Sequence, residues 1–541
     1  ATNALAVRVD LPPPGTRLDI VPWGLADWWE YGGITGPVWL EAGDQLSVVR
    51  AQVVPHLDAA DVTVVVRNHS SQPVQNGTLE ADILPAQVTA ADLLNPDPTS
   101  LVPPGSTPIA RETITSIGLS PGAVASYEFT FVLSGAYPWT PALPALYVLR
   151  IRLGGSTPAP LSSPGLSPSP ASASPAAASP AAALSPGAIT APASPALVSH
   201  QDTFYTTYGL RTIQVDPSHP RLLLNGAPTS FVGVSVQDER VWPPRPGPDS
   251  VRGGPHPSPA DWERVLEQAR AVHADLLRTG HTPASPQLLM LADRMGFAIW
   301  EEIPLTHNTP QTLTLAMGRG IPQQMLAEMD LRDFNHPSVL FHGFANESTG
   351  GPIRTQAMKT LNDLDHRVDG TRLTGQAMYG SDPSDPTSGP LDVAGYTFYY
   401  GVFYGGAGIE GATLKALAAG HATYPRKPIM ILEFGRWADN PAEAQLQEVV
   451  FRRTYRALHA RWGTRPHGYV GAALWWTLND YWTALPGMGV EHFGVYRPDG
   501  TQRPVAAPMA SNYLHVAETS GAGVQQSIVS GGRGAAPHPP S

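Results

Sequence analysis

Short apolar runs alternate with helical patterns over residues 216–519 of this 541-residue chain. Runs such as FVGVSV (231–236) and PIMILEF (428–434) are typical of buried strands. A strand followed by a helix and then by another strand predicts a parallel pair, with the helix crossing over one face of the sheet. Eight such strands within roughly 300 residues predict a closed (β/α)8 TIM barrel.

The helices of this barrel are expected where apolar side chains recur at three- and four-residue spacing. This pattern predicts helices over 259–272, 286–296, 312–334 and 441–463. A barrel of this kind presents its reactive side chains at the carboxyl ends of the strands, so the residues that end each apolar run are the candidate site.

Residues 46–215 have the alternating pattern of strands, as in VTVVVRN (62–68) and SYEFTFVL (126–133), separated by Pro, Gly, Asn and Ser. They predict an immunoglobulin-like β-sandwich. Within this region, residues 154–201 are a Pro/Ala/Ser segment of low complexity. Such a segment cannot bury enough apolar surface to fold, so we expect a disordered insertion between two neighbouring strands of the sandwich.

The two ends of the chain predict less structure. Residues 1–45 hold short strand-like pieces around several tryptophans, which is too little to close a β-sandwich. We interpret them as the C-terminal part of a β-domain whose first half is absent from this chain. Residues 520–541 are rich in Gly, Ser and Pro and predict a disordered tail.

The composition excludes several classes of function. A net charge of −11 without a long basic run argues against nucleic-acid binding, which requires clustered Lys and Arg. No window approaches 18 uninterrupted apolar residues, so no membrane span is predicted. The chain has no cysteine, which excludes disulfides and Cys-based metal sites. The compartment and the oligomeric state, including a homo-oligomer, are left undetermined by the sequence.

Two glutamates stand where apolar strands end: Glu347 in VLFHGFANES and Glu433 in PIMILEFGR. On strands 4 and 7 of a barrel they would face each other across its mouth. Retaining hydrolysis of a glycosidic bond needs two such carboxyls about 5–5.5 Å apart. We therefore predict Glu347 as the acid/base and Glu433 as the nucleophile, with Asn346 holding the sugar 2-hydroxyl; two structural salt bridges are the alternative.

At this point the sequence resembles glycoside hydrolase family 2, which contains β-galactosidases, β-glucuronidases and β-mannosidases. The resemblance implies a jelly roll, so residues 1–45 would be the C-terminal part of a sugar-binding jelly-roll domain. It also implies a carbohydrate substrate and a retaining, exo-acting β-glycosidase; we predict no cofactor. The matching segments are DWWEYGGITGPVWLE (27–41), YGLRTIQVD (208–216), LNGAPTSFVGVS (224–235), RTGHTP (278–283), NHPSVLFHGFANES (335–348), DVAGYTFYYG (392–401), KPIMILEFG (427–435) and WTLNDYW (476–482).

The resemblance also implies roles for five further residues. Asp27 would reach the substrate from a loop, and His281 would contact sugar hydroxyls. Arg278 would keep the nucleophile ionised, and Tyr399 would donate a hydrogen bond to it. Trp476 would lie under the sugar ring. Each of these side chains could instead be structural.

Three positions depart from the family pattern. Gln237 replaces a strand-1 histidine, which alters one sugar contact. The magnesium-binding Glu-Thr-His run is Leu305-Thr306-His307 here, so no obligatory metal is predicted. The segment 487–496, where glucuronidases would place a carboxylate-binding lysine, has none, and Arg497 is the nearest cation.

These departures favour a β-galactosidase-like enzyme acting on a neutral sugar. A β-glucuronidase and a β-mannosidase are the alternatives within the same class. A carbohydrate-binding relative that has lost turnover is the alternative from another class, motivated by the incomplete jelly roll and by Gln237.

Overall fold

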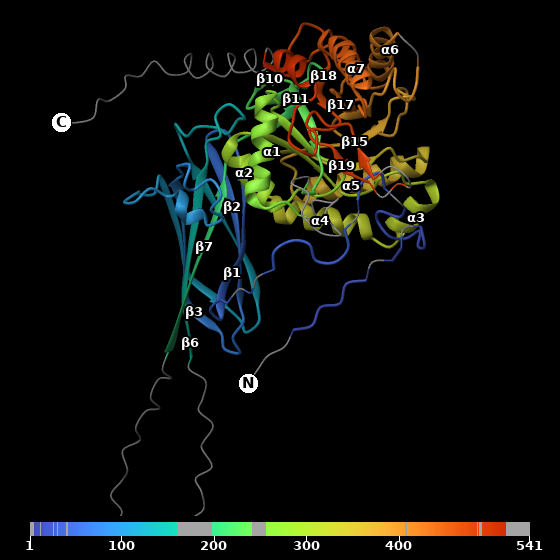
Figure 1. Ribbon diagram of the computed structural model, residues 1–541. Coiled ribbons are helices and arrows are strands. Elements are labelled where there is room, and N and C mark those ends of the chain that lie inside the picture. Colours follow the sequence, from blue (N-terminus) through green and yellow to red (C-terminus); the bar gives the residue numbers. More distant parts are fainter. Residues whose placement is uncertain are drawn as a thin grey trace, which may run out of the picture.

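The computed structural model describes residues 5–158, 197–240 and 256–514, apart from residues 11, 14, 25, 30, 39, 41, 406, 407, 484 and 486–488. Two bodies make up the described chain: a β-sandwich and, beside it, a barrel ringed by helices (Figure 1). No helix of the described residues combines the length and apolar character needed to cross a membrane.

Eight parallel strands form the predicted closed barrel, in which each strand pairs with the next and the eighth pairs with the first. All residues of the first strand are buried, as expected for strands covered on both faces. The prediction of a TIM barrel is confirmed. The strands are β11 (Phe231–Val236), β12 (Leu276–Thr279), β13 (Ala298–Glu302), β14 (Val339–Asn346), β15 (Leu373–Tyr379), β16 (Ala394–Thr397), β17 (Ile429–Phe434) and β18 (Val470–Trp475).

Two helix predictions need correction. The predicted helix 312–334 is two helices, because Gly320 lies in the left-handed region at φ 73° and Pro322 follows it at the start of the next helix. The last predicted helix ends at His459 rather than 463, since the chain turns there and Trp462 pairs with Val470. The helices are α1 (Pro259–Ala271), α2 (Pro286–Met295), α3 (Pro310–Gly318), α4 (Ile321–Asp333), α5 (Gly351–Val368), α6 (Ile409–Thr423) and α7 (Pro441–His459).

The N-terminal sandwich consists of a three-stranded and a four-stranded antiparallel sheet, in the orders β1-β2-β5 and β4-β3-β6-β7. Alternate side chains of both sheets meet in one apolar core, as the immunoglobulin-like prediction requires. The elements are β1 (Leu46–Pro55), β2 (Ala59–Asn68), β3 (Val74–Pro85), a short 3₁₀ helix η1 (Pro98–Leu101), β4 (Ala110–Leu119), β5 (Val124–Val132), β6 (Tyr147–Pro158) and β7 (Leu197–Tyr208).

The low-complexity segment connects neighbouring strands, as predicted, but strands extend into both of its predicted ends. β6 and β7 pair from Tyr147 with Tyr208 to Pro158 with Leu197, so residues 154–158 and 197–201 belong to strands. Pairing to a partner strand orders these ends even though their composition is poor in apolar residues. The remaining residues 159–196, and the predicted tail at 520–541, lie outside the described residues.

A small sheet joins the sandwich to the amino-terminal end of the barrel. It contains β8 (Ile213–Val215), β9 (Leu222–Leu224) and β10 (Ala227–Thr229). The predicted boundary at 215/216 therefore divides one sheet. Trp139 of the sandwich is buried here, and its indole N–H donates to the carbonyl of Asp293 at 3.0 Å.

The described residues within 5–45 form no strand, which corrects the strand-like pieces expected there. An isolated strand segment is not stable without a neighbour, and none pairs with this one in the described chain. Instead Ala26 and Trp28 are buried at the mouth of the barrel, together with Trp476 and Tyr481. A two-stranded ribbon of β19 (Tyr481–Trp482) and β20 (Val490–Glu491) lies at the same mouth.

Candidate active site

A cavity of about 850 Å³ opens at the carboxyl ends of the barrel strands. This is the end at which barrel enzymes carry their reactive groups. Most of the predicted site residues line it: Asp27, His281, Asn346, Glu347, Tyr399, Glu433 and Trp476. Arg278 is fully buried beneath the cavity and contacts it only indirectly, through its hydrogen bond to Glu433.

Glu433 belongs to β17 and is held by two donors. The guanidinium of Arg278 donates to one carboxylate oxygen at 2.6 Å, and the hydroxyl of Tyr399 donates to the other at 2.8 Å. Burial raises the pKa of Tyr399 well above its usual range, so the phenol keeps its proton and acts as a donor. Both donors stabilise negative charge on the carboxylate oxygens that they contact. The family resemblance implied both contacts.

Sequence reasoning missed Glu302, which organises this region. It ends β13 and accepts two hydrogen bonds from Arg278, at 2.9 and 3.2 Å, and one from the Trp300 indole at 3.0 Å. Burial alone would raise the pKa of Glu302, but Arg278 and His281 lower it below its ordinary value. Its signal in the sequence is an acid closing the apolar run AIWEE, the same pattern that identified Glu347 and Glu433.

Glu347, directly after β14, has a different environment. Its backbone is in the left-handed region at φ 42°, an unusual conformation for glutamate that re-aims the side chain at the strand end. Burial, together with the charge of Glu433, raises its pKa to about 8. The Thr397 hydroxyl donates to Oε1 at 2.6 Å, and the Nε2 atom of His307 lies 3.5 Å from Oε2.

Asn346 lies at the end of β14 with its amide oriented by neighbours. Its oxygen accepts from Arg278 at 2.9 Å, and its nitrogen lies 3.4 Å from the hydroxyl of Thr306. The amide therefore has an N–H available toward the cavity that it lines. Binding of a sugar hydroxyl by this group stays a prediction.

An aromatic wall lies beside these polar groups. The ring of His281 is nearly parallel to Trp476, with centroids 5.2 Å apart, and meets the edge of Trp28 at 5.1 Å. The Nδ1 atom of His281 lies 2.5 Å from Glu302, which orients the ring and leaves Nε2 facing Glu433 at 3.9 Å. Burial raises the pKa of Asp27, the acid contributed by the N-terminal segment.

The structure gives the positions of the residues that depart from the family pattern. Gln237 lines a neighbouring cavity of about 470 Å³ instead, beside Trp28. His307 lines the main cavity, where its Nε2 atom faces the candidate acid Glu347. Arg497 bonds Thr501 and Gln502 and does not line the main cavity.

Among the described lining residues of this cavity there is no Lys or Arg. Its acidic groups are Asp439, Glu491, Asp27 and the two candidate catalytic glutamates, and three histidines, His281, His307 and His492, also line it. Burial, aided by the charges of Asp27 and Asp439, raises the pKa of Glu491 to about 7.

A parallel eight-stranded barrel with paired carboxyls at the ends of strands 4 and 7 is typical of glycoside hydrolases. Residues 261–457 match the family model described as "Glycosyl hydrolases family 2, TIM barrel domain". Over these residues the barrel matches glycoside hydrolase family 2.

Curated relatives include a β-glucuronidase of Streptococcus agalactiae, 27% identical over 256 residues, which are 43% of this chain and 41% of that protein. A β-galactosidase of Thermoanaerobacterium thermosulfurigenes is 34% identical over 109 residues, 20% of this chain and 14% of that protein. The chain thus spans less than half the length of these relatives.

Among solved structures, a family 2 β-galacturonidase of Eisenbergiella tayi bound to galacturonate superposes with a TM-score of 0.69 at 18% identity, covering 92% of this chain and 78% of that one. At this identity the likeness concerns the fold.

Proposed function

We propose that this chain carries the catalytic centre of a retaining, exo-acting β-glycosidase that hydrolyses a terminal, neutral, β-galactoside-like sugar. The observation that carries the proposal is the contrast between two carboxyls in one cavity. Glu433 is held by Arg278 and Tyr399, while burial raises the pKa of Glu347 to about 8. One ionised and one protonated carboxyl at neutral pH are the two groups that retaining hydrolysis requires.

In the first step, Glu347 gives its proton to the glycosidic oxygen while a carboxylate oxygen of Glu433 attacks the anomeric carbon. The bond between that carbon and the leaving oxygen breaks, and a covalent glycosyl ester forms on Glu433. The leaving group departs as an alcohol. Glu347, now ionised, lies near His307 and keeps the hydrogen bond from Thr397.

In the second step, Glu347 takes a proton from water and the hydroxyl oxygen attacks the anomeric carbon. The ester bond to Glu433 breaks, which restores both carboxyls and retains the β-configuration. Arg278 and Tyr399 stabilise the carboxylate of Glu433 as it leaves. Asn346 is proposed to bind the 2-hydroxyl in the transition state, and Trp476 to pack under the ring.

The acidic lining supports a neutral sugar. A substrate carboxylate that enters a partly desolvated cavity needs a fixed cation; the described lining offers Asp27, Asp439 and Glu491 but no Lys or Arg, and its His492 is already paired with Asp480. We therefore expect kcat/KM for nitrophenyl β-galactoside to exceed that for the β-glucuronide by at least about tenfold, equivalent to about 1.4 kcal/mol.

A β-glucuronidase is the second candidate, because the protein of that name from Streptococcus agalactiae matches the longer stretch of this chain. Comparing the two nitrophenyl glycosides at neutral pH decides between them. Faster hydrolysis of the glucuronide would reject the neutral-sugar proposal and leave the two-glutamate mechanism standing.

The mechanism itself is tested by an activated 2-fluoro glycoside, which forms a glycosyl ester that hydrolyses slowly. Mass spectrometry should find the label on Glu433. Label on another residue would refute the assignment, and absence of both label and turnover on a panel of β-glycosides would favour a carbohydrate-binding relative without catalysis.

A further inference from the structure

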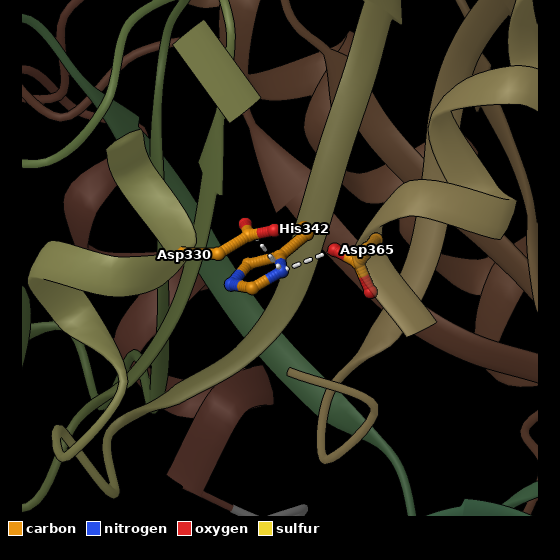
Figure 2. A group of neighbouring side chains, drawn as sticks. All are labelled: Asp330, His342 and Asp365. Atoms are coloured by element: carbon orange, nitrogen blue, oxygen red, sulfur yellow. Dashed lines mark hydrogen bonds and ion pairs between the residues drawn. The ribbon is translucent and has the colours of Figure 1, made fainter. Parts of the chain in front are cut away.

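Three side chains that the proposed reaction does not use lie together in the interior, outside the barrel wall (Figure 2). His342 comes from β14, Asp330 from the last turn of α4, and Asp365 from the last turn of α5. No more than 1% of any of them is exposed. The Nδ1 atom of His342 lies 2.6 Å from Asp365 and 3.5 Å from Asp330, so one ring nitrogen faces two buried carboxylates.

Three carboxyl groups surround this ring. Glu301 faces the other ring nitrogen, with its Oε1 atom 3.7 Å from Nε2 of His342. In the described chain, neither Asp330 nor Asp365 has an ion pair with Lys or Arg. Both aspartates also stand at helix C-termini, where the helix dipoles favour a cation.

Several of these oxygens are buried without a partner. Within the described residues, both carboxylate oxygens of Asp330 accept no hydrogen bond, and neither does one oxygen of Asp365. The Asp330 carboxylate points at the imidazole of His342 (Figure 2). Unsatisfied carboxylate oxygens in the interior are unfavourable unless a cation or a proton binds them.

We propose that Asp330, His342 and Asp365 bind a divalent transition-metal ion, with zinc as the best match. One ligand atom from each residue lies within 4.8 Å of the others. Zinc takes imidazole nitrogen and carboxylate oxygen at about 2.0–2.2 Å, which places tetrahedral ligand atoms roughly 3.3–3.6 Å apart. The Asp330 contact already has this spacing, and the Asp365 contact has to open. Two carboxylates then balance the charge of the ion, and Glu301 faces Nε2 at 3.7 Å as an outer carboxylate.

The ion would have a structural role. It would join β14 to both helices that cover it, five positions before Glu347, without facing the cavity that holds the candidate catalytic residues. This departs from the sequence prediction of no metal, which considered only the run at Leu305-Thr306-His307. Zinc removal should therefore lower stability first, and turnover only as the fold loosens.

The rival explanation is a proton. Burial, with the charges of Asp365, Asp369 and Glu301, raises the pKa of Asp330 to about 8. A protonated Asp330 beside a charged His342 would satisfy the same atoms without a metal. The two explanations predict opposite effects of Asp330→Asn on stability. The substitution removes a metal ligand in the first case and lowers stability, whereas in the second it keeps a neutral side chain and stability does not fall.

The experiment strips the chain with a chelator and then adds Zn²⁺, Mn²⁺ or Mg²⁺. Elemental analysis of the zinc-treated protein after dialysis should find about one zinc per chain. Calorimetry should show that this protein melts several degrees higher than the chelator-treated protein. Co²⁺ in place of zinc should give visible absorption bands of a four- or five-coordinate site. Manganese bound at the same stoichiometry would support the site with a different ion.

Two variants and one control complete the test. Asp330→Asn keeps the shape of the side chain, and His342→Gln removes the nitrogen ligand; each should lose at least 100-fold in zinc affinity. In Asp293→Asn, which changes the partly buried pair of Asp293 with His336 at 2.5 Å, zinc binding should be unchanged. The proposal would be overturned if the wild-type protein retained neither zinc nor manganese. It would also be overturned if Asp330→Asn raised the melting temperature and zinc changed the melting temperature of neither the variant nor the wild type.

Discussion

The ends of strands 4 and 7 each carry a glutamate that lines the same cavity, yet the two carboxyls have different neighbours. At the end of β17, Glu433 meets Arg278 and Tyr399, and Arg278 is itself fixed by Glu302. At the end of β14, Glu347 has a threonine hydroxyl and a half-exposed histidine, and no arginine bonds it in the described chain.

The difference shows how one barrel obtains an acid and a base from one kind of side chain. A fixed cation favours the ionised carboxylate, whereas burial near another negative charge favours the protonated form. Burial raises the pKa of Glu347 to about 8, and the charge of Glu433 contributes to that shift. The ionised state proposed for Glu433 therefore helps to keep the proton on Glu347.

The strongest test of this contrast removes the nucleophile. Glu433→Gln cannot form the glycosyl ester, so we expect a loss of at least roughly 10⁴-fold in kcat, as for other enzymes without their nucleophile. Sugar binding, measured by calorimetry, should persist. Turnover within tenfold of the wild type would show that another carboxyl attacks.

Removal of the acid should depend on the leaving group. Glu347→Ala should lose about 10²–10⁴-fold on substrates with poor leaving groups, which need the proton, and far less on dinitrophenyl glycosides. Azide should restore the second step and yield a β-glycosyl azide. Equal losses on both substrate types, without the azide product, would contradict an acid/base role.

Tyr399→Phe removes one donor from Glu433 and leaves Arg278 in place. A hydrogen bond to a charged group contributes about 1.5–3 kcal/mol, so kcat/KM should fall roughly 10- to 100-fold. Tyr396→Phe is the matched control, because its buried hydroxyl bonds the carbonyl of Pro383 instead. If the two variants lose activity equally, the effect of Tyr399 is one of packing.

The smallest effect is the alkaline limb of the pH profile. Because the pKa of Glu347 is raised to about 8, its proton is present below that pH and is lost above it. We expect kcat/KM to fall about tenfold per unit above this value. The Glu347→Ala variant should lack this limb; a limb that survives the substitution would come from another group.

Much of the fold could be predicted from the sequence, since strands, helices and their order depend on local patterns. Eight apolar runs with helices between them predicted the barrel and placed Glu347 and Glu433 on strands 4 and 7. Errors arose where a local pattern depends on distant partners. The strand-like pieces within residues 1–45 have no partner strand in the described chain, and residues 197–201 became a strand because β6 lies beside them.

Only part of the candidate site could be predicted from such local patterns. The sequence pattern identifies Glu347, Glu433 and Asn346, because they are polar groups at the ends of apolar runs. Glu302 has the same pattern but follows another glutamate, and the sequence alone does not tell which of the two faces the barrel interior. His342 stands in the middle of an apolar run and gives no indication of its two aspartate neighbours.

The sequence by itself therefore determined which chemical groups end each strand, because apolar periodicity is a property of neighbouring residues. Only the tertiary structure decided which buried charges are neighbours: Arg278 with Glu433, Glu302 and Asn346, and His342 with Asp330 and Asp365. The physical reason is that pKa values and ion pairing depend on distances of a few ångströms between residues far apart in the chain, and on the exclusion of water around them.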